Sequence, residues 1–440
     1  MFATRTLIRL IRGYDLPVTA RARVRAGLAL LCGVGALVYL FTLFFNSLQT
    51  DLFVYLAGAQ AVLDGRPLYG EDVGIISENR FLPFTYPPFA AFAVIPFAVV
   101  SKQIALAAWF LLSVSALIGI AVMTATRLPA LANRVATRAT VQQLAILVFV
   151  LAAISEPISR NLDLGQVNLY LVVALMYDTL HRTRFTGYLT GIAAGFKVTP
   201  GIFILFMLTT RRWADAARAI AGLATTLLIG SVLGINQIVQ YWTSVLFDVS
   251  RVGESARLSN VSLQGVMYRI MGDGGGARAL WLVLAVIILG AGIVVATLWW
   301  DRSRLVAVSI VGATSLVISP ISWVHHGVWV VPLAGACAAL AVRARGASQR
   351  GTFWALVVAA LLTALPSIIQ WRTGPFGSRH PELPLVPFDG GVSRDLVGMG
   401  YGAAAVATIA ILAVALRLPK GSYEADPATP ILRAQATNAR

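Results

Sequence analysis

The sequence predicts an all-α polytopic membrane protein, and two observations carry this prediction. Of the 440 residues, 58% are hydrophobic and only 12% are charged, about half the charged share of a soluble globular domain, which is roughly 25%. Apolar runs of about 20 residues, the length that crosses a bilayer as a helix, recur along the whole chain. No window shows the alternation of apolar and polar residues that a membrane β-barrel requires. The spans are therefore expected to be helices.

About 10–12 transmembrane or half-depth helices are expected in one transmembrane domain, residues 27–416. A basic cytoplasmic N-terminus, residues 1–26, precedes it, and a polar cytoplasmic tail rich in Pro and Ala, residues 417–440, follows it. The apolar segments lie near residues 27–48, 84–100, 104–125, 142–158, 167–180, 187–210, 217–235, 278–300, 304–320, 326–342, 352–369 and 394–416.

The charge pattern predicts which side of the membrane each loop faces. The net charge is +16, but the arginines precede the first span or lie in short loops, as the positive-inside rule requires. This pattern indicates membrane lipids and phosphate ligands as partners, and no nucleic acid. Three longer loops, 49–83, 236–277 and 370–393, fall on the opposite, periplasmic side. Cys32 and Cys337 both lie in apolar runs, so no disulfide is expected.

Two apolar segments do not fit simple crossings. The basic loops on either side of residues 187–210 both belong inside, so this run is expected to be a pair of half-depth helices that breaks at "GFKVTPG", where Pro200 and Gly201 disfavour a helix. Irregular backbone at membrane depth lines a wet cavity or is buried in protein, so Lys197 is expected to face a cavity. By the same counting, the segment 84–100 dips into the membrane without crossing it.

Asp51 and Glu156 stand apart from the other carboxylates because each abuts a span, at a depth where an ionisable group is expensive and often functional. For Asp51 the alternative is a carboxylate that stabilises a helix N-terminus. His325 and His326, in "SPISWVHHG", lie where an apolar segment breaks. One of them suits hydrogen bonding to an anion or a proton relay, and the alternative is a buried neutral histidine. His380 lies in the polar loop "GSRHPELP".

No metal is expected, because adjacent histidines on a helix point about 100° apart and no HExxH or DxD motif accompanies them. Three other motifs combine a cation with amides or hydroxyls, as a phosphate or sugar ligand requires, although each alone suits contacts between helices. They are "SRNLDLGQVN" with Arg160, Gln166 and Asn168, "GFKVTPG" with Lys197, and "SNVSLQGVMYR" with Asn260 and Arg269.

The ordered strings "DLFVYLAGAQAVLDGRPLY", "FTYPPFAA", "LGQVNLYLVVAL", "GIAAGFKVTPGIFILF", "RRW" and "NVSLQGVMYR" resemble glycosyltransferase family 87, which consists of membrane enzymes of the GT-C superfamily. The resemblance covers roughly residues 40–345. Within the family, "ISPISWVHH" resembles the actinobacterial members that depend on polyprenol-phosphate mannose. The segments after about residue 350 match no pattern of the family.

The resemblance implies an inverting mannosyltransferase of the inner (plasma) membrane with its active site facing the periplasm. The donor is polyprenyl-phosphate mannose, the acceptor is a phosphatidylinositol mannoside that is extended in α-1,2 linkage, and no cofactor or metal is needed. The family's acidic residue after the first span corresponds to Asp51, its lysine in the K-x-T-P turn to Lys197, and its late helix break to His325 and His326.

The chemistry then assigns roles. A hydroxyl that attacks the sugar in line needs one base, and Asp51 is the candidate. The leaving phosphate gains charge and needs donors, for which His325 or His326, Lys197, Arg160 and Arg269 are candidates. The expected sugar and acceptor contacts are Tyr55, Gln166, Asn168, Asn260 and Trp323. Aromatic belts at the membrane interface are the alternative for the aromatic rings, and for Tyr69 and Tyr86 the preferred one.

Other functions remain open at this point. A transferase for another prenyl-phosphate sugar, such as arabinofuranose, would show the same pattern. A lipid or sugar transporter or flippase also has many spans and a broken helix, but no internal repeat is visible. A lipid-binding scaffold without activity would leave Asp51 unexplained.

Overall fold

The computed structural model describes residues 18–70, 75–77, 80–253, 255–257, 260–371 and 391–419. Within these residues the chain is almost entirely helical, which confirms the predicted class; its strands are the short antiparallel pair β1 (Ile75–Ser77) and β2 (Arg80–Phe81). His380, most of the third predicted loop and most of the predicted tail lie outside the described residues, as do residues 1–17.

Each predicted apolar segment contains at least one helix. In chain order the α-helices are α2 (Val18–Phe45), α3 (Thr50–Leu63), α4 (Pro88–Ala98), α5 (Lys102–Ala125), α6 (Leu128–Leu131), α7 (Arg138–Ala153), α8 (Glu156–Leu164), α9 (Asn168–Leu180), α10 (Tyr188–Phe196), α11 (Ile202–Thr209), α12 (Trp213–Gly230), α13 (Ile235–Thr243), α14 (Leu263–Met271), α15 (Gly275–Trp300), α16 (Arg304–Ile318), α17 (Val330–Gly346), α18 (Arg350–Trp371) and α19 (Gly391–Ala415). Short 3₁₀ helices are η1 (Thr199–Gly201), η2 (Ser231–Leu233), η3 (Val245–Phe247), η4 (Val249–Arg251) and η5 (Val324–Trp329).

Five helices in the described part of the chain are long and apolar enough to cross a membrane, and a sixth span results if α7 and α8, bent by 68°, count as one. Shorter apolar helices of 10–17 residues accompany them. The protein is therefore a multi-pass membrane protein with the expected mixture of full and partial spans. With 11 residues, α4 is only about 16 Å long, half the thickness of a hydrocarbon core, which suits a segment that dips without crossing.

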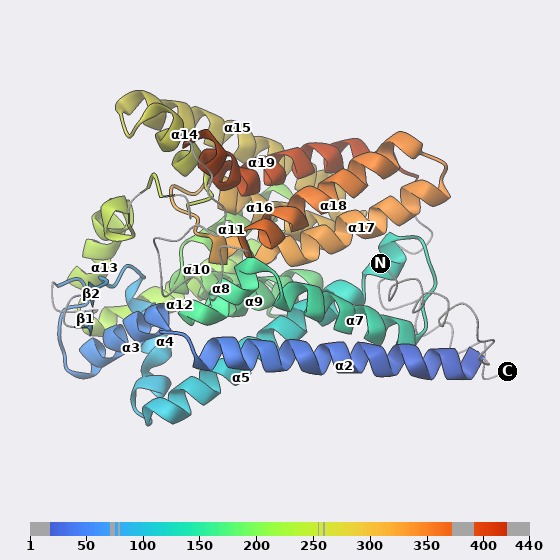
Figure 1. Cartoon of the computed structure of the whole chain (residues 1–440). Helices are drawn as coiled ribbons and strands as arrows, with labels where there is room; N and C mark the ends of the chain where they lie inside the picture. Colours follow the sequence, from blue (N-terminus) through green and yellow to red (C-terminus); the bar gives the residue numbers. More distant parts are fainter. Residues whose placement is uncertain are drawn as a thin grey trace.

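The two long loops that the structure describes contain helices, of which only the one that begins beside Asp51 was anticipated. The first, residues 49–83, holds α3 and the β1–β2 pair, and the second, residues 236–277, holds most of α13 and all of α14. In Figure 1, α3, α4, β1, β2 and α13 gather at one end of the molecule, whereas α2 begins and α17 turns into α18 at the other. The two loops with periplasmic assignments thus share an end, away from the start of α2.

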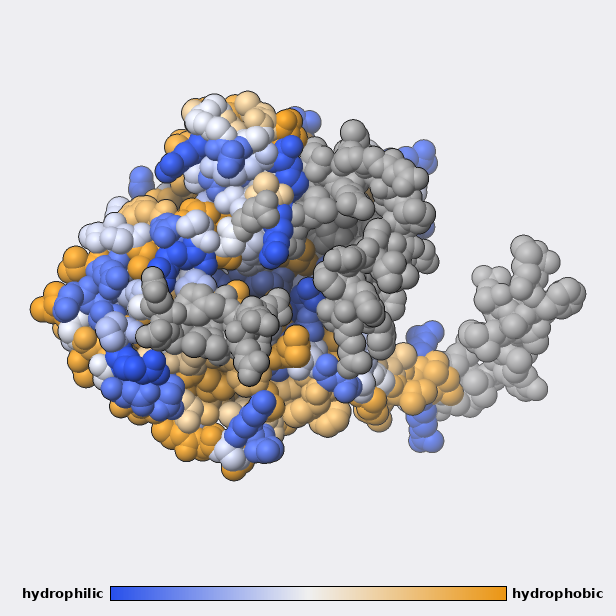
Figure 2. Space-filling view, turned by 60° about the vertical axis from the view of Figure 1, so that its left-hand side comes forward, coloured by the Kyte–Doolittle hydropathy of each residue, from blue (hydrophilic) through white to orange (hydrophobic). Residues whose placement is uncertain are grey.

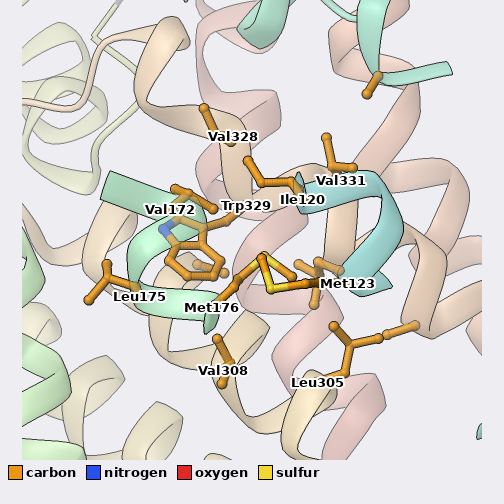
Figure 3. Packing of buried hydrophobic residues seen from close by; sticks show 14 of the residues in the cluster. Ile120, Met123, Val172, Leu175, Met176, Leu305, Val308, Val328, Trp329 and Val331 are labelled. Carbon is orange, nitrogen blue, oxygen red and sulfur yellow. The ribbon is translucent and has the colours of Figure 1, made fainter. Parts of the chain in front are cut away.

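The core forms where α5, α9, α16 and α17 meet (Figure 3). Almost every residue of α16 is buried, which makes it the central helix. Ile120 and Met123 of α5 pack there with Met176 of α9 and Val308 of α16, and the Trp329 ring stacks on Phe203 with ring centres 5.5 Å apart. Because lipid is as apolar as these side chains, close packing is the stabilising term here. This rigid core fixes the ends of α9 and α16, which carry the site.

The helix break predicted at "GFKVTPG" is confirmed. α10 ends at Phe196, Lys197 is extended with φ −149° and ψ 133°, and the turn η1 precedes α11. The two pieces have 9 and 8 residues, about 13 Å and 12 Å, so each reaches only partway through a bilayer. The break places the Lys197 side chain inside the protein.

Candidate active site

Asp51 lies in the first turn of α3, directly after a sharp bend in the backbone. Gln49 adopts the left-handed conformation with φ 52°, and its Nε2 donates a 2.7 Å hydrogen bond to the carbonyl of Phe44, the penultimate residue of α2. This bend turns the chain from the first span into α3. The N-cap position belongs to Gln49 and makes no side-chain cap bond. Asp51 is therefore not the helix N-cap, and its carboxylate points to a distant partner.

That partner is Gln166, between α8 and α9. Its Nε2 donates a 2.6 Å hydrogen bond to Asp51 Oδ2 and lies 3.2 Å from the Tyr86 hydroxyl. Its Oε1 accepts from the Tyr55 hydroxyl at 2.9 Å and from Asn168 Nδ2 at 3.4 Å. Both ends of the Gln166 amide are therefore fixed by protein groups, while Asp51 Oδ1 accepts no hydrogen bond from the described residues.

Gly165 allows the turn between α8 and α9 to lie close to the start of α3. It ends α8 with φ +69°, and the backbone N–H groups of Gly165 and Gln166 bond back to the carbonyls of Leu162 and Asn161, as in a Schellman turn. A Cβ atom at this position would lie 2.6 Å from Leu52 Cβ and 2.7 Å from Gln49 Oε1. Only glycine combines the left-handed backbone with such close contact to the start of α3.

Lys197 extends the cluster toward the histidines. Its Nζ donates to Asn168 Oδ1 at 3.0 Å and lies 3.1 Å from His326 Nε2. It also lies 5.7 Å from the centre of the Tyr86 ring. Asn168 and His326 line a cavity of about 30 Å³ together with Thr199 and Ser315. Lys197 itself does not line this cavity but bonds to two residues that do, so its facing a cavity stays a prediction.

The two histidines differ in their surroundings. His325 is fixed through its backbone carbonyl, which accepts 3.1 Å bonds from Asn161 Nδ2 and Asn168 Nδ2, and its buried ring Nε2 has no hydrogen-bond partner among the described residues. His326 presents its ring to Lys197. The rings are perpendicular, with centres 4.7 Å apart, so they do not share a ligand-binding direction.

The charges around Asp51 are nearly balanced. Burial raises the pKa of Asp51 above its ordinary value, while the Gln166 hydrogen bond and the positive charges of Lys197 and Arg160 lower it. Arg160 forms an ion pair with Asp163 one turn later on α8. A carboxylate with a raised pKa beside fixed cations is typical of a proton acceptor.

Three predicted site residues form a second group. The Asn260 side chain accepts from the backbone N–H groups of Ser262 and Ser322 and donates to the carbonyls of Ser255 and Pro320. Asn260 also pairs with Trp323 as an isolated β-bridge. Arg269 Nη1 donates to the carbonyls of Arg257 and Asn260. This group braces the loop that leads to His325, and no contact given by the structure joins it to Asp51.

Sequence reasoning missed Tyr86, which contacts Gln166, and two residues that lie behind the site, Tyr69 and Asn161. The belt interpretation is wrong for Tyr86 and for Tyr69, which is 6% exposed and donates to the Tyr86 carbonyl at 2.9 Å. Asn161 supports His325 through a hydrogen bond to its backbone carbonyl. The "FTYPP" motif contained the signal for Tyr86, because a tyrosine before a Pro-Pro helix start has a fixed position.

Among the described residues, no three His, Cys, Asp or Glu side chains come close enough to hold a metal ion. The Asp51 cluster, defined as Asp51, Tyr55, Tyr86, Gln166, Asn168, Lys197, His325 and His326, instead offers one carboxylate, one ammonium, amides, hydroxyls and imidazoles. At the end of the molecule where α3 and α13 lie, hydrophilic residues surround a recess in the surface (Figure 2). Such a set suits transfer of a sugar from a phosphate to a hydroxyl.

The fold and this cluster define a polytopic helical membrane protein of the GT-C type, with a polar site built from helix ends. The sequence profile of Glycosyltransferase family 87 matches residues 84–320, and the chain belongs to this family. No solved structure matches the chain significantly.

Similar curated proteins support this assignment. One is the polyprenol-phosphate-mannose-dependent alpha-(1-2)-phosphatidylinositol mannoside mannosyltransferase of Mycobacterium tuberculosis, 32% identical over 84% of this chain and 86% of its own length. The protein with the same description from Mycolicibacterium smegmatis is 30% identical over 88% of this chain and 90% of its own length. A pentamannoside mannosyltransferase from Mycolicibacterium smegmatis is 32% identical over 72% of this chain and 77% of its own length.

Proposed function

We propose that the protein transfers mannose from polyprenyl-phosphate mannose to a phosphatidylinositol mannoside and forms an α-1,2 linkage. The descriptions of the similar proteins name this donor, this acceptor class and this linkage. The single structural observation that supports the proposal most is the Asp51 cluster, in which a carboxylate with one free oxygen shares a hydrogen-bond network with Lys197.

The proposed reaction is one in-line displacement. The acceptor hydroxyl attacks the anomeric carbon of the mannose, its O–H bond breaks, and its proton passes to Asp51 Oδ1. The bond between the anomeric carbon and the phosphate oxygen breaks, and the phosphate keeps the electron pair. A β-linked donor therefore gives an α-mannoside. Proton removal of this kind contributes about 10²–10⁴-fold in rate.

Lys197 and His326 are proposed to receive the leaving phosphate. The phosphate gains negative charge as the bond breaks, and donors already fixed in place stabilise that charge without rearrangement. Lys197 is fixed by Asn168 and His326. These groups make a metal ion unnecessary for the leaving group, so we propose that transfer is metal-independent. Arg160, paired with Asp163, contributes longer-range charge.

Gln166 is proposed to position Asp51. Because Tyr55, Tyr86, Asn168 and Asp51 occupy its amide, none of its donors or acceptors is left for a direct bond to the sugar. The hydrogen bond to Oδ2 holds the carboxylate so that Oδ1 faces the acceptor. Tyr55, fully buried, supports Gln166 from behind.

The prenyl chain is proposed to leave the cluster past a small apolar cavity of about 40 Å³ between α16, α17, α18 and α19, which has room only for the first carbons of the chain. This cavity shares Leu316 and Trp329 with the polar cavity at His326. A lipid phosphate at the polar cavity would therefore have an apolar path for its chain directly next to it.

We also propose that the site faces the periplasm across the inner membrane. The start of α2, with Arg23 and Arg25, and the turn from α17 to α18, flanked by Arg345 and Arg350, lie at the end away from α3 and α13, which supports this orientation. In intact spheroplasts, an impermeant maleimide should label Arg66→Cys, after α3, and spare Arg345→Cys, in the last turn of α17, in a chain without Cys32 and Cys337. The opposite labelling pattern would reverse the orientation.

The activity test uses purified protein, polyprenyl-phosphate [¹⁴C]mannose and a phosphatidylinositol mannoside. Wild-type protein should give a product that α-1,2-mannosidase cleaves. Activity with a nucleotide sugar in place of the lipid donor, or with prenyl-phosphate arabinofuranose alone, would refute the proposed donor.

A further inference from the structure

A second group of charged residues lies at the opposite ends of the helices that carry the Asp51 cluster. α9 begins at Asn168 in the cluster and ends at Leu180, and α16 begins at Arg304 and ends just before the histidine loop. With 15 residues, α16 separates its two ends by about 22 Å. The far end therefore lies near the opposite face of the membrane.

Four arginines from different segments converge at this far end. Arg127 follows α5 and donates to the carbonyl of Leu180, Arg182 lies between α9 and α10, Arg212 precedes α12 and Arg304 begins α16. Arg304 is close enough to Arg182 and Arg212 to be repelled by both, and Arg127 is repelled by Arg304. The fold thus holds like charges together at an energetic cost.

Trp300, the last residue of α15, contacts two of these four arginines. The guanidinium carbon of Arg212 lies 4.5 Å from the ring centre of Trp300, and that of Arg304 lies 5.0 Å from it. A guanidinium over an aromatic ring keeps its planar N–H donors directed outward at the edge of the ring. The ring therefore fixes both arginines without using their hydrogen-bond donors.

Three acids nearby neutralise this group only in part: Asp301 lies close enough to attract Arg304, and Asp215 and Asp178 lie close enough to attract Arg212. Asp215 bonds to Arg212 and Arg218, while Asp178 is fully engaged by the backbone of Gly187 and by Thr190. Arg212 Nη1 has no acceptor although the side chain is only 8% exposed. Neither Arg304 nor Arg182 donates a hydrogen bond to any described residue. Positive charge and N–H donors are therefore in excess.

We propose that Arg127, Arg182, Arg212 and Arg304 form a binding site for a phosphate group, the headgroup of an anionic lipid in the leaflet opposite the Asp51 cluster. Guanidinium groups bind phosphate oxygens through paired N–H donors, and basic pockets between membrane helices bind anionic headgroups. Arg182 is exposed, so a lipid reaches the group laterally from the membrane. Free phosphate shares the chemistry and is the alternative source.

The test measures thermal unfolding of the full-length protein in a neutral detergent at constant ionic strength. Three probes are titrated: dioctanoyl phosphatidic acid, dioctanoyl phosphatidylcholine and inorganic phosphate. Phosphatidic acid should raise the Tm of the wild type in a saturable manner, and phosphatidylcholine should not. If inorganic phosphate has the same half-saturation concentration as phosphatidic acid, the site stands but its ligand is a soluble phosphate.

Arg304→Gln is the main variant, because Arg304 makes no ion pair with any residue that the structure describes. Its half-saturation concentration for phosphatidic acid should rise about tenfold, the loss expected for one charge-assisted hydrogen bond. Arg182→Gln, on an exposed residue, tests the same site if Arg304→Gln does not fold. The matched control is Arg345→Gln, which removes one positive charge in the last turn of α17 and is not one of the two arginines over the Trp300 ring.

The control should bind phosphatidic acid within twofold of the wild type. Equal losses in Arg304→Gln, Arg182→Gln and Arg345→Gln would show general attraction to a basic surface and overturn the site. Equal stabilisation by phosphatidylcholine, or unchanged binding in both Arg304→Gln and Arg182→Gln, would overturn it as well.

Discussion

Gln166 Nε2 lies 2.6 Å from Asp51 Oδ2, although 115 residues separate them in the chain. This hydrogen bond joins the α8–α9 turn to the first turn of α3 and occupies one oxygen of the carboxylate. The other oxygen has no hydrogen bond to a described residue. The geometry therefore distinguishes an orienting side from a reacting side of Asp51.

Asp51→Asn should lower kcat by about 10²–10⁴-fold, because the amide cannot accept the acceptor proton. The change keeps the shape of the side chain, so the thermal unfolding curve should remain close to that of the wild type. The measurement is transfer of labelled mannose in single-turnover and steady-state assays. Asp64→Asn is the control: Asp64 ends the same helix, is exposed and pairs with Arg66, so its activity should stay within twofold. Full activity of Asp51→Asn would exclude its role as base.

Gln166→Met should shift the acidic limb of the kcat–pH profile to higher pH. The base works in its ionised form, so activity falls as pH decreases through the pKa of Asp51. Burial raises that pKa and the Gln166 hydrogen bond lowers it; without the bond, the pKa rises further. A positioning role predicts a lower kcat with an unchanged KM for the acceptor. A raised KM with an unchanged limb would indicate direct contact with the sugar instead.

Gly165→Ala should reduce transfer at least tenfold. A methyl group there would lie 2.6 Å from Leu52 Cβ, which forces Gln166 away from Asp51. Gly65→Ala provides a matched control, because Gly65 has φ +65° with no heavy atom within 4 Å of the added Cβ. Both variants should lose about 1–2 kcal/mol of stability from the left-handed backbone, but only Gly165→Ala should lose activity. Equal activities would disprove the steric argument.

Lys197→Met should lower kcat by about 10²–10³-fold, the usual cost of removing one donor to a developing negative charge. Lys197 Nζ has two partners, Asn168 and His326, so the reaction should also become less sensitive to His326→Ala in the double variant. Lys102→Met removes an exposed ammonium that lies over the Phe53 ring and should leave transfer unchanged. Independent, multiplicative losses in the double variant would separate Lys197 from His326.

Chelation should leave the rate unchanged, because Lys197 and His326 supply the positive charge at the leaving phosphate. The assay is mannose transfer after dialysis against excess EDTA, with and without added Mg²⁺ or Mn²⁺. A loss that Mg²⁺ or Mn²⁺ reverses would require a metal at the site.

The helical class, the break at Lys197 and most of the Asp51 cluster could be predicted from the sequence, because each produces a local signal. Polar residues at membrane depth, a proline after a lysine and a carboxylate after a span are visible in the order of residues. The hydrogen-bond partners of these residues could not be predicted from the sequence. Asn260 and Gln166 both looked like ligand-binding amides, but one braces backbone groups and the other holds Asp51. Which of these roles an amide has depends on how distant helices pack against each other. That packing cannot be predicted from a single sequence.

The helices within the second long loop were missed for a related reason. α13 and α14 have 9 residues each, too few to be stable alone in water, and their composition is mixed. They are stabilised by packing against the other helices. Tyr86 was missed because an aromatic ring near an interface has the same sequence signature whether it faces lipid or a buried amide.

The broken helix and the distant partners together determine when the site forms during synthesis. The ribosome makes the site residues in the order Asp51, Tyr86, Gln166, Lys197 and His326. Each earlier polar side chain therefore lacks at least one hydrogen-bond partner until a later segment has been made. Contacts of such high sequence separation form slowly. Asp51 therefore lacks its hydrogen-bond partner until Gln166 has been made and its nearby cation until Lys197 has been made, and Lys197 lacks one of its two partners until His326 has been made. A nascent chain that stops before this point would expose its buried polar groups to the quality-control machinery of the membrane.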